Sequence, residues 1–172
     1  MINTIFLQGV QLVNQHERVH HYYSQAVGWM ELRVGDKGLR SLSFISKPAV
    51  QQSSEKDPLT SRVIKELDDY FAGNFRSFSI PLDPQEGTFF QRRVWDQLQE
   101  IPYGEIRSYG DVAKAVGNPR GARAVGLANK RNCIPIVIPC HRVIRSNGGI
   151  GGYDSGLHIK RALLALEGVK VS

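Results

Sequence analysis

The sequence predicts an α+β protein in two parts, a small β-sheet domain over residues 1–85 and a helical domain over residues 86–172. Residues 28–44 alternate apolar and polar side chains around a Gly-rich turn, as a β-hairpin does. The second half instead repeats apolar residues at helical spacing, and capping signals precede two of its runs. Between these patterns, residues 74–87 contain two prolines and a glycine and are typical of a connector.

In the first half, the hairpin turns at Gly35-Asp36-Lys37-Gly38 and returns over residues 39–44. A helix follows, because apolar residues recur at helical spacing between Leu59 and Phe71, and Gly73 ends it. The first twenty residues are mixed in character and predict no element.

In the second half, Thr88 with Gln91 and Ser108 with Asp111 are capping pairs that each begin a helix. The Ile-Pro-Tyr-Gly segment at 101–104 ends the first of these helices. The last helix runs over residues 157–166 and is closed by a glycine.

Gly117-Asn118-Pro119 separates the helix that starts at Ser108 from a third one that starts near Gly121. Two short helices joined by a tight turn are the sequence form of a helix-turn-helix, although the pattern is also common in bundles that bind no DNA. The third helix is built from small residues around one long cation, Arg123. Small residues suit a close approach either to a nucleic-acid groove or to a neighbouring helix.

The net charge of +6 lies wholly in the second half, because residues 1–85 carry nine basic and nine acidic side chains. Between Arg107 and Arg145 there are eight basic residues and a single acidic one, Asp111. A localised basic surface is the electrostatic footprint of a polyanion binder such as nucleic acid. The alternative is a solvated basic face without a partner.

Composition is that of an ordinary globular chain, with 41% hydrophobic and 22% charged residues. No signal peptide or membrane-spanning run is evident, so we expect a cytoplasmic protein that does not enter membranes. Cys133 and Cys140 are too few for a disulfide framework, and their spacing matches no metal motif.

Cys140 is the candidate nucleophile. It ends an apolar run that two prolines are expected to hold extended, and an imidazole and a guanidinium follow it in Pro139-Cys140-His141-Arg142-Val143. Neighbouring cations favour the reactive thiolate. The alternative is a buried structural cysteine at the end of a core strand.

Two features after this run admit both a functional and a structural interpretation. Residues 146–156 are rich in glycine and either cradle a flat ligand or simply connect two elements, since they match no phosphate or dinucleotide fingerprint. Glu167 ends the last helix, where a carboxylate opposes the helix dipole. It is either a tolerated surface residue or one kept there to orient an imidazole.

Taken together, residues 88–168 resemble the O6-alkylguanine-DNA alkyltransferases, the methylated-DNA–protein-cysteine methyltransferases. The Pro-Cys-His-Arg-Val signature at 139–143 is the most specific part of the resemblance. The other matching segments are Phe90 to Trp95, Ile101 to Gly104, Ser108-Tyr109, Ala122 to Gly126, Asn132 and Leu166 to Gly168. The first half matches loosely, as a ribonuclease H-like domain, and the second implies a winged-helix-like domain.

The resemblance implies a DNA repair enzyme that needs no cofactor. Cys140 would take the alkyl group from O6 of a guanine and keep it, so each molecule would act once. His141 would serve as base through a water, Glu167 would orient its ring, and Asn132 would hold the local turn. Whether O4-alkylthymine is also a substrate stays open.

The resemblance also implies duplex DNA containing O6-alkylguanine as the partner, bound by a monomer through the minor groove with the guanine flipped out. Arg123 would fill the gap in the base stack, and Tyr109 would hold the flanking phosphate and reach the base. Further DNA contacts would come from the small-residue helix, at Ala122, Ala124 and Gly126. The substrate pocket would be lined by Tyr109, Pro135, Val143, Gly152, Tyr153 and Asp154, the last replacing the Ser of many relatives.

Some relatives hold a structural zinc through Cys and His in the first half. That half contains His16, His20 and His21 but no Cys, so we expect no metal and a surface location for these histidines.

Three other functions were weighed against repair. They are a helix-turn-helix regulator without chemistry, a cysteine hydrolase using Cys140, His141 and Glu167, and a relative that binds alkylated DNA without repairing it. A nearly bare recognition helix counts against the first. The basic half is unexplained by the second, and the presence of Cys140 counts against the third.

Overall fold

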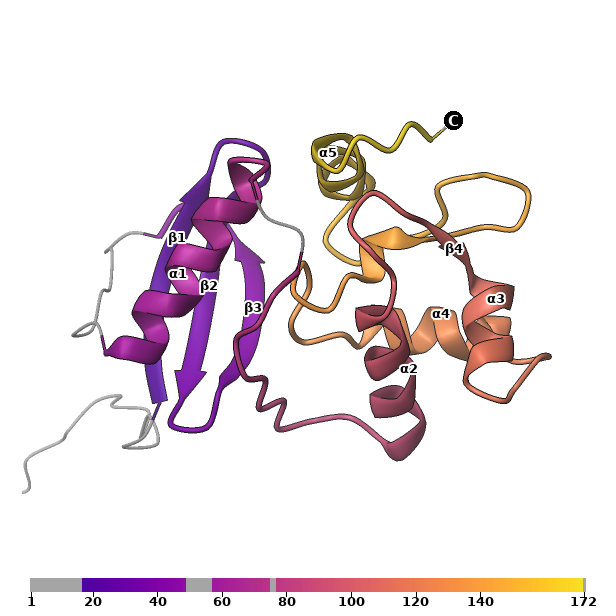
Figure 1. The fold of residues 1–172 in the computed structure, drawn as a ribbon, viewed down its shortest axis with the longest axis horizontal. Coiled ribbons are helices and arrows are strands. Elements are labelled where there is room, and N and C mark those ends of the chain that lie inside the picture. The colour runs from indigo at the N-terminus through magenta and orange to yellow at the C-terminus, as the bar shows by residue number, and fades with distance from the viewer. Residues whose placement is uncertain (1–16, 49–56, 75–76, 172) are drawn as a thin grey trace, which may run out of the picture.

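The structure, a computed structural model, describes residues 17–48, 57–74 and 77–171. A sheet with one helix forms the N-terminal half, and a group of short helices forms the C-terminal half beside it (Figure 1). Within the described residues, no helix is long and apolar enough to cross a membrane.

The N-terminal half is an antiparallel three-stranded sheet in the order β1 (Glu17–Ser24), β2 (Gly28–Gly35) and β3 (Leu39–Ile45). Helix α1 (Pro58–Phe71) lies across one face of this sheet (Figure 1). The predicted hairpin is confirmed as β2 and β3, and the predicted helix as α1. Strand β1 falls partly in the stretch for which the sequence predicted nothing, and it is defined by its pairing with β2.

The expected surface location of the histidines is wrong for His20. His20 lies on β1 with its side chain directed inward and is 2% exposed, while His21 places its ring 3.7 Å from the Glu31 carboxylate. The two side chains point to opposite faces of the strand, yet the His21 side chain is also only 9% exposed, so neither described histidine has the expected surface location. His16 lies outside the described residues.

The C-terminal half begins with α2 (Phe89–Gln99), β4 (Arg107–Ser108) and α3 (Tyr109–Ala115). It continues with α4 (Ala122–Lys130), a 3₁₀ turn η1 (Cys140–Arg142), β5 (Val143–Ile144) and α5 (Leu157–Leu166). Both predicted capping boxes are present, at the starts of α2 and α3. The parallel pairing of β4 with β5 was not predicted, because two-residue strands leave no periodic pattern.

The prediction of an extended apolar run before Cys140 is wrong. The Ile138 N–H donates to the Ile134 carbonyl at 2.9 Å, and Ile136 has a φ of +75°, so the chain closes into a compact turn. The two prolines in this run lack an N–H and fix φ, which denies it a strand partner. Cys140 itself is the first residue of the 3₁₀ turn η1, so it does not lie on extended backbone either.

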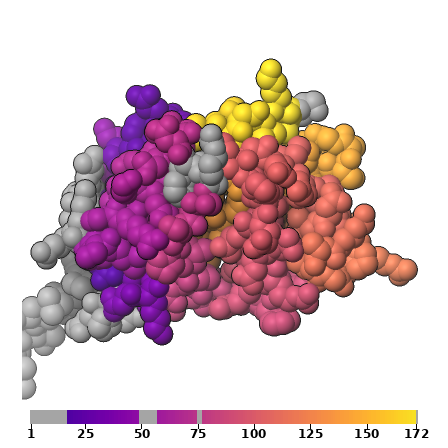
Figure 2. All heavy atoms as spheres, viewed as in Figure 1, coloured from indigo at the N-terminus to yellow at the C-terminus, as the bar shows by residue number. Residues whose placement is uncertain are grey.

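One continuous hydrophobic core joins the two halves, whose atoms lie directly against one another in Figure 2. The core includes Met30, Leu32 and Leu67 from the first half and Val94, Leu98, Ile134 and Leu163 from the second. A backbone hydrogen bond of 2.9 Å, from the Leu42 N–H on β3 to the Cys133 carbonyl, ties the sheet edge to the turn that precedes Cys140. The first half is therefore a structural support of the site.

Candidate active site

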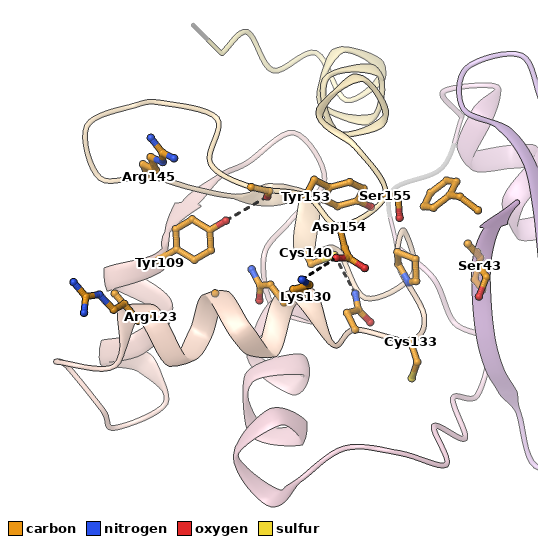
Figure 3. A pocket seen from close by; sticks show the side chains of 18 of the residues that line it. Ser43, Tyr109, Arg123, Lys130, Cys133, Cys140, Arg145, Tyr153, Asp154 and Ser155 are labelled. Atoms are coloured by element: carbon orange, nitrogen blue, oxygen red, sulfur yellow. Dashed lines mark hydrogen bonds and ion pairs between the residues drawn. The ribbon is translucent and has the colours of Figure 1, made fainter.

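A cavity of about 1040 Å³ opens between α4, the Gly-rich loop and the edge of the sheet at β3 (Figure 3). Cys140 lines it. The other predicted residues that line it are Tyr109, Ala122, Arg123, Gly126, Asn132, Pro135, Gly152, Tyr153 and Asp154. Val143 does not line it, because its side chain is buried in the core on β5, and Ala124 lies elsewhere on α4.

Asn132 holds Cys140 in place. Its side-chain nitrogen lies 3.1 Å from the Cys140 sulfur and donates at 2.8 Å to the Ile138 carbonyl, while its oxygen accepts from the Ile134 N–H at 3.0 Å. Burial raises the pKa of the Cys140 thiol above 9.0, although the Asn132 contact opposes the rise. The resting sulfur is therefore a protonated thiol, and a nearby base must remove its proton before it attacks.

His141 and Glu167 form a buried pair, with 2.7 Å between His141 Nε2 and Glu167 Oε1. Burial alone would raise the pKa of Glu167, but hydrogen bonds from His141 and Arg142 hold it at about 2. An ionised carboxylate can only accept, so His141 Nε2 carries the hydrogen. His141 Nδ1 is then an unprotonated nitrogen, and it is buried without a hydrogen-bond partner among the residues that the structure describes.

Arg142 supplies the positive charge that pairs with Glu167 in this cluster. It reaches both Glu167 oxygens, at 2.8 and 2.9 Å, and donates to the Ile101 carbonyl at 2.6 Å. Arg142 is therefore not part of the predicted basic surface, because its side chain is turned inward and pairs with Glu167. A bidentate pair of this kind fixes the orientation of the carboxylate.

The Ile-Pro-Tyr-Gly segment at 101–104 secures Glu167 from the other side. The Gly104 N–H donates to Glu167 Oε2 at 3.1 Å, and the Tyr103 hydroxyl donates to the Leu166 carbonyl at 2.8 Å. Gly104 has a φ of +80°, and a Cβ there would lie 3.1 Å from the Glu167 carbonyl oxygen, so this position favours glycine. These contacts explain how Glu167 is held at the end of a helix that its charge disfavours.

Lys160 lies beside the site and was not among the residues predicted from the sequence. It lies fully buried on α5, and its ammonium donates to the carbonyls of Val143, at 2.5 Å, and Gly152, at 3.3 Å. Burial lowers the pKa of Lys160 to about 8, and its positive charge lowers the pKa of Cys140. A signal was present, since this lysine falls on the apolar face of α5 beside Ile159 and Leu163.

Tyr109 forms one wall of the cavity against the Gly-rich loop (Figure 3). Gly151 has a φ of +75°, and a Cβ there would meet the Tyr109 hydroxyl at 3.0 Å and a ring carbon at 3.1 Å. The Lys160 ammonium lies 5.9 Å from the centre of the Tyr109 ring. The loop packs closely against the Tyr109 ring here, and a side chain at Gly151 would occupy the space that this ring fills.

Exposed cations line the side of the cavity formed by α4 and the loop, at Arg123 and Lys130 on α4 and Arg145 on the loop (Figure 3). Lys130 lies 3.7 Å from the carboxylate of Asp154. The small residues of α4 serve two faces, because Val125 and Ala128 are buried while Ala122 and Gly126 line the cavity. Helix packing is therefore confirmed for the buried face of α4, and approach to a nucleic-acid groove stays a prediction for the other face.

Trp95 fixes the orientation of α4. Its indole N–H donates to the Ala128 carbonyl at 2.9 Å, and Arg93, also on α2, donates to the Val116 carbonyl after α3 at 2.9 Å.

Among the described residues, no group of three or more His, Cys, Asp or Glu side chains is arranged to hold a metal ion.

Two family models divide the chain between them. One, described as 6-O-methylguanine DNA methyltransferase, ribonuclease-like domain, matches residues 19–84, and the DNA binding domain of the same methyltransferase matches residues 89–169. A methylated-DNA–protein-cysteine methyltransferase of Methanosarcina acetivorans is 47% identical over 150 residues, which are 85% of this chain and 96% of that protein. The chain belongs to the methylated-DNA–protein-cysteine methyltransferase family.

Other members of the methylated-DNA–protein-cysteine methyltransferase family are also similar to this chain. The constitutive protein of Bacillus subtilis is 50% identical over 123 residues, covering 70% of this chain and 74% of that one. A crystal structure of Mycobacterium tuberculosis OGT in complex with DNA superposes with a TM-score of 0.75 at 43% identity, covering 87% and 91% of the two chains. The predicted α+β class is confirmed, and the protein is an enzyme of the methylated-DNA–protein-cysteine methyltransferase type.

Proposed function

We propose that this methyltransferase repairs duplex DNA by moving the alkyl group from O6 of a flipped-out guanine irreversibly onto the sulfur of Cys140, once per molecule. The observation that carries the proposal is a buried thiol on the wall of a cavity, next in sequence to a His–Glu pair whose tautomer leaves one basic nitrogen unprotonated. The exposed cations that line one side of the cavity support DNA as the source of the base.

The transfer can be written with every proton placed. His141 takes the thiol proton through a water molecule, and the Cys140 sulfur attacks the alkyl carbon. The bond from that carbon to O6 breaks and its electron pair passes to the base. The base takes up one proton from water to become guanine, and protonated His141 returns the thiol proton to water. The product is a thioether, which offers water no electrophilic carbonyl, so no second step releases the enzyme.

Arg123 is proposed to occupy the space that the flipped guanine leaves in the stack. It is exposed near the N-terminal end of α4, one turn before Gly126, on a helix whose small residues permit close approach to the minor groove. Tyr109 would contact the flanking phosphate and the base edge. Because Arg123, Lys130 and Arg145 would meet phosphates, binding should weaken with salt and show little sequence preference.

The experiment is to incubate the protein with a duplex containing O6-methylguanine and to weigh the intact chain. We expect one added methyl group, which peptide mapping places on Cys140. Cys140→Ser should abolish the mass gain and retain DNA binding, because the serine keeps the shape of the cavity. A methyl group found on another residue contradicts the proposal, as does repair by Cys140→Ser.

A further inference from the structure

Tyr70 belongs to the half of the protein that does not contain Cys140, yet it contacts the catalytic cluster. Its hydroxyl donates a hydrogen bond of 2.8 Å to Glu167 Oε1, across 97 positions of sequence. Tyr70 lies near the end of α1 and is fully buried. The contact is therefore a direct link between the sheet domain and the Glu167–His141 pair.

We propose that Tyr70 is a positioning residue for alkyl transfer, through which the N-terminal half holds and tunes the Glu167 carboxylate that serves His141. This inference rests on the proposed function of Cys140, His141 and Glu167. It gives the first half a part in the chemistry in addition to its part in folding.

The donors around Glu167 show why one hydroxyl matters. Oε1 accepts from His141 Nε2 at 2.7 Å, from Tyr70 at 2.8 Å and from Arg142 Nη2 at 2.9 Å. Three donors share one oxygen, so each one reduces the negative charge left for the others. The bond to His141 is thus set in part by Tyr70.

Tyr70 is held in a single donating role. Burial, followed by the nearby Glu167 charge, raises the pKa of its hydroxyl well above 10.0, so the hydroxyl keeps its hydrogen. Its ring packs at 5.5 Å from the Phe78 ring and edge-on at 6.0 Å from the Tyr103 ring. The Tyr103 hydroxyl also donates to the carbonyl of Leu166, the residue before Glu167, so Tyr103 helps to hold both Tyr70 and Glu167 in place.

Removing the Tyr70 hydroxyl should strengthen the electrostatic stabilisation of protonated His141 by Glu167. With one donor fewer, Oε1 carries more negative charge and stabilises the protonated imidazole, so the pKa of His141 rises. The other charged or titratable groups near this pair are unchanged by the substitution, namely Cys140, Arg142, Lys160 and Tyr103. A higher pKa of His141 leaves less of the neutral base near neutral pH.

The test compares Tyr70→Phe with a matched control, Tyr22→Phe. Phenylalanine keeps the ring in both variants. The Tyr22 hydroxyl also bonds a carboxylate on α1, that of Asp68 at 2.7 Å, but it does not reach Glu167. The measurement is the rate of alkyl transfer from O6-methylguanine in duplex DNA as a function of pH, with thermal stability recorded for each protein.

For Tyr70→Phe we expect the acid-side midpoint of the rate profile to move up by about half a pH unit, with a slower rate below it, while Tyr22→Phe follows the wild type. A merely structural tyrosine would lower the melting temperature without moving the midpoint. A Tyr70→Phe midpoint that stays in place or moves down overturns the inference, whatever the height of the profile.

A second readout separates this inference from the proposed function. Labelling of Cys140 by iodoacetamide, followed by peptide mass at each pH, reports on the same thiol without DNA. If wild-type protein takes no alkyl group from DNA, the proposed function fails, and a shifted labelling midpoint in Tyr70→Phe still supports the link through Glu167. If wild-type protein is alkylated and the transfer midpoint of Tyr70→Phe does not move up, only the role of Tyr70 fails, whatever the labelling shows.

Discussion

Glu167 Oε1 lies 2.7 Å from His141 Nε2, and both side chains are fully buried. Because the pKa of Glu167 is about 2, the carboxylate is charged throughout the neutral range and fixes the imidazole tautomer. Burial lowers the pKa of His141 below 6.5, although Glu167 opposes the change. His141 is therefore neutral at pH 7, which is the form that a general base requires.

The pH dependence of transfer follows from this pair. We expect the rate with duplex O6-methylguanine to persist below pH 6.5 and to fall only as the pH drops through the lowered pKa of His141. Single-turnover rates across a pH series, with DNA binding kept saturated, measure it. An acid-side midpoint above 6.5 would contradict the assignment of His141 as a buried neutral base.

Replacing Glu167 by Gln should destabilise the fold in a pH-dependent way. The folded-state pKa of this carboxyl is depressed from 4.5 to about 2, so its stabilising contribution is complete above pH 4.5 and is lost as the pH falls through about 2. At pH 7 the substitution leaves Arg142 buried without its counter-charge, at a cost of about 3 kcal/mol.

Urea unfolding of the wild type and Glu167→Gln at pH 7 and at acid pH checks this expectation. The difference in unfolding free energy should shrink on acidification, because the wild-type carboxyl then also becomes neutral. Equal stabilities at pH 7, or a gap that widens in acid, would show that the carboxylate is not held as described.

Lys160→Met should slow the transfer by about tenfold at pH 7, because it removes the buried positive charge that lowers the pKa of Cys140. Raising the pH should recover part of the rate, since the thiol then ionises without this help. Lys114→Met, which removes a charge from exposed α3, is the control. Wild-type rates at every pH in Lys160→Met would refute this role.

Arg123→Ala should impair repair in duplex DNA much more than attack on the free base O6-methylguanine, because only the duplex requires a base to be flipped. We expect a loss of about tenfold or more in duplex and little change with the free base. Arg120→Ala removes the same charge from the exposed turn before α4, at a position that does not line the cavity. Equal losses on both substrates would remove Arg123 from the flipping step.

The elements that the sequence predicted best are those with strong local signals. Capping pairs at Thr88 and Ser108 and the turn at 35–38 fix helix starts and a hairpin from neighbouring residues alone. The turn before Cys140 could not be predicted in this way, because its shape depends on a left-handed φ at Ile136, a buried β-branched residue for which the sequence gives no such signal.

The site was predictable to a similar extent. Cys140, His141, Glu167 and Asn132 were predicted, and the structure pairs Asn132 with Cys140 and His141 with Glu167. Tyr70 and Gly104 were missed because their contacts with Glu167 span 97 and 63 positions of sequence, which no periodic pattern records. Lys160 was missed although it falls among the apolar residues of α5. Arg142 was counted as a surface cation, although a charge next to a buried signature is a candidate for an internal partner.

The central claim is that one sulfur accepts one alkyl group and keeps it, and a titration with excess lesion tests it most directly. A fixed amount of protein is incubated to completion with increasing duplex O6-methylguanine, and both the restored guanine and the mass of the protein are measured. We predict that repair stops at one lesion per molecule, with every chain carrying one methyl group at Cys140. Continued repair beyond that equivalence, or restored guanine beside unmodified Cys140, would contradict the account.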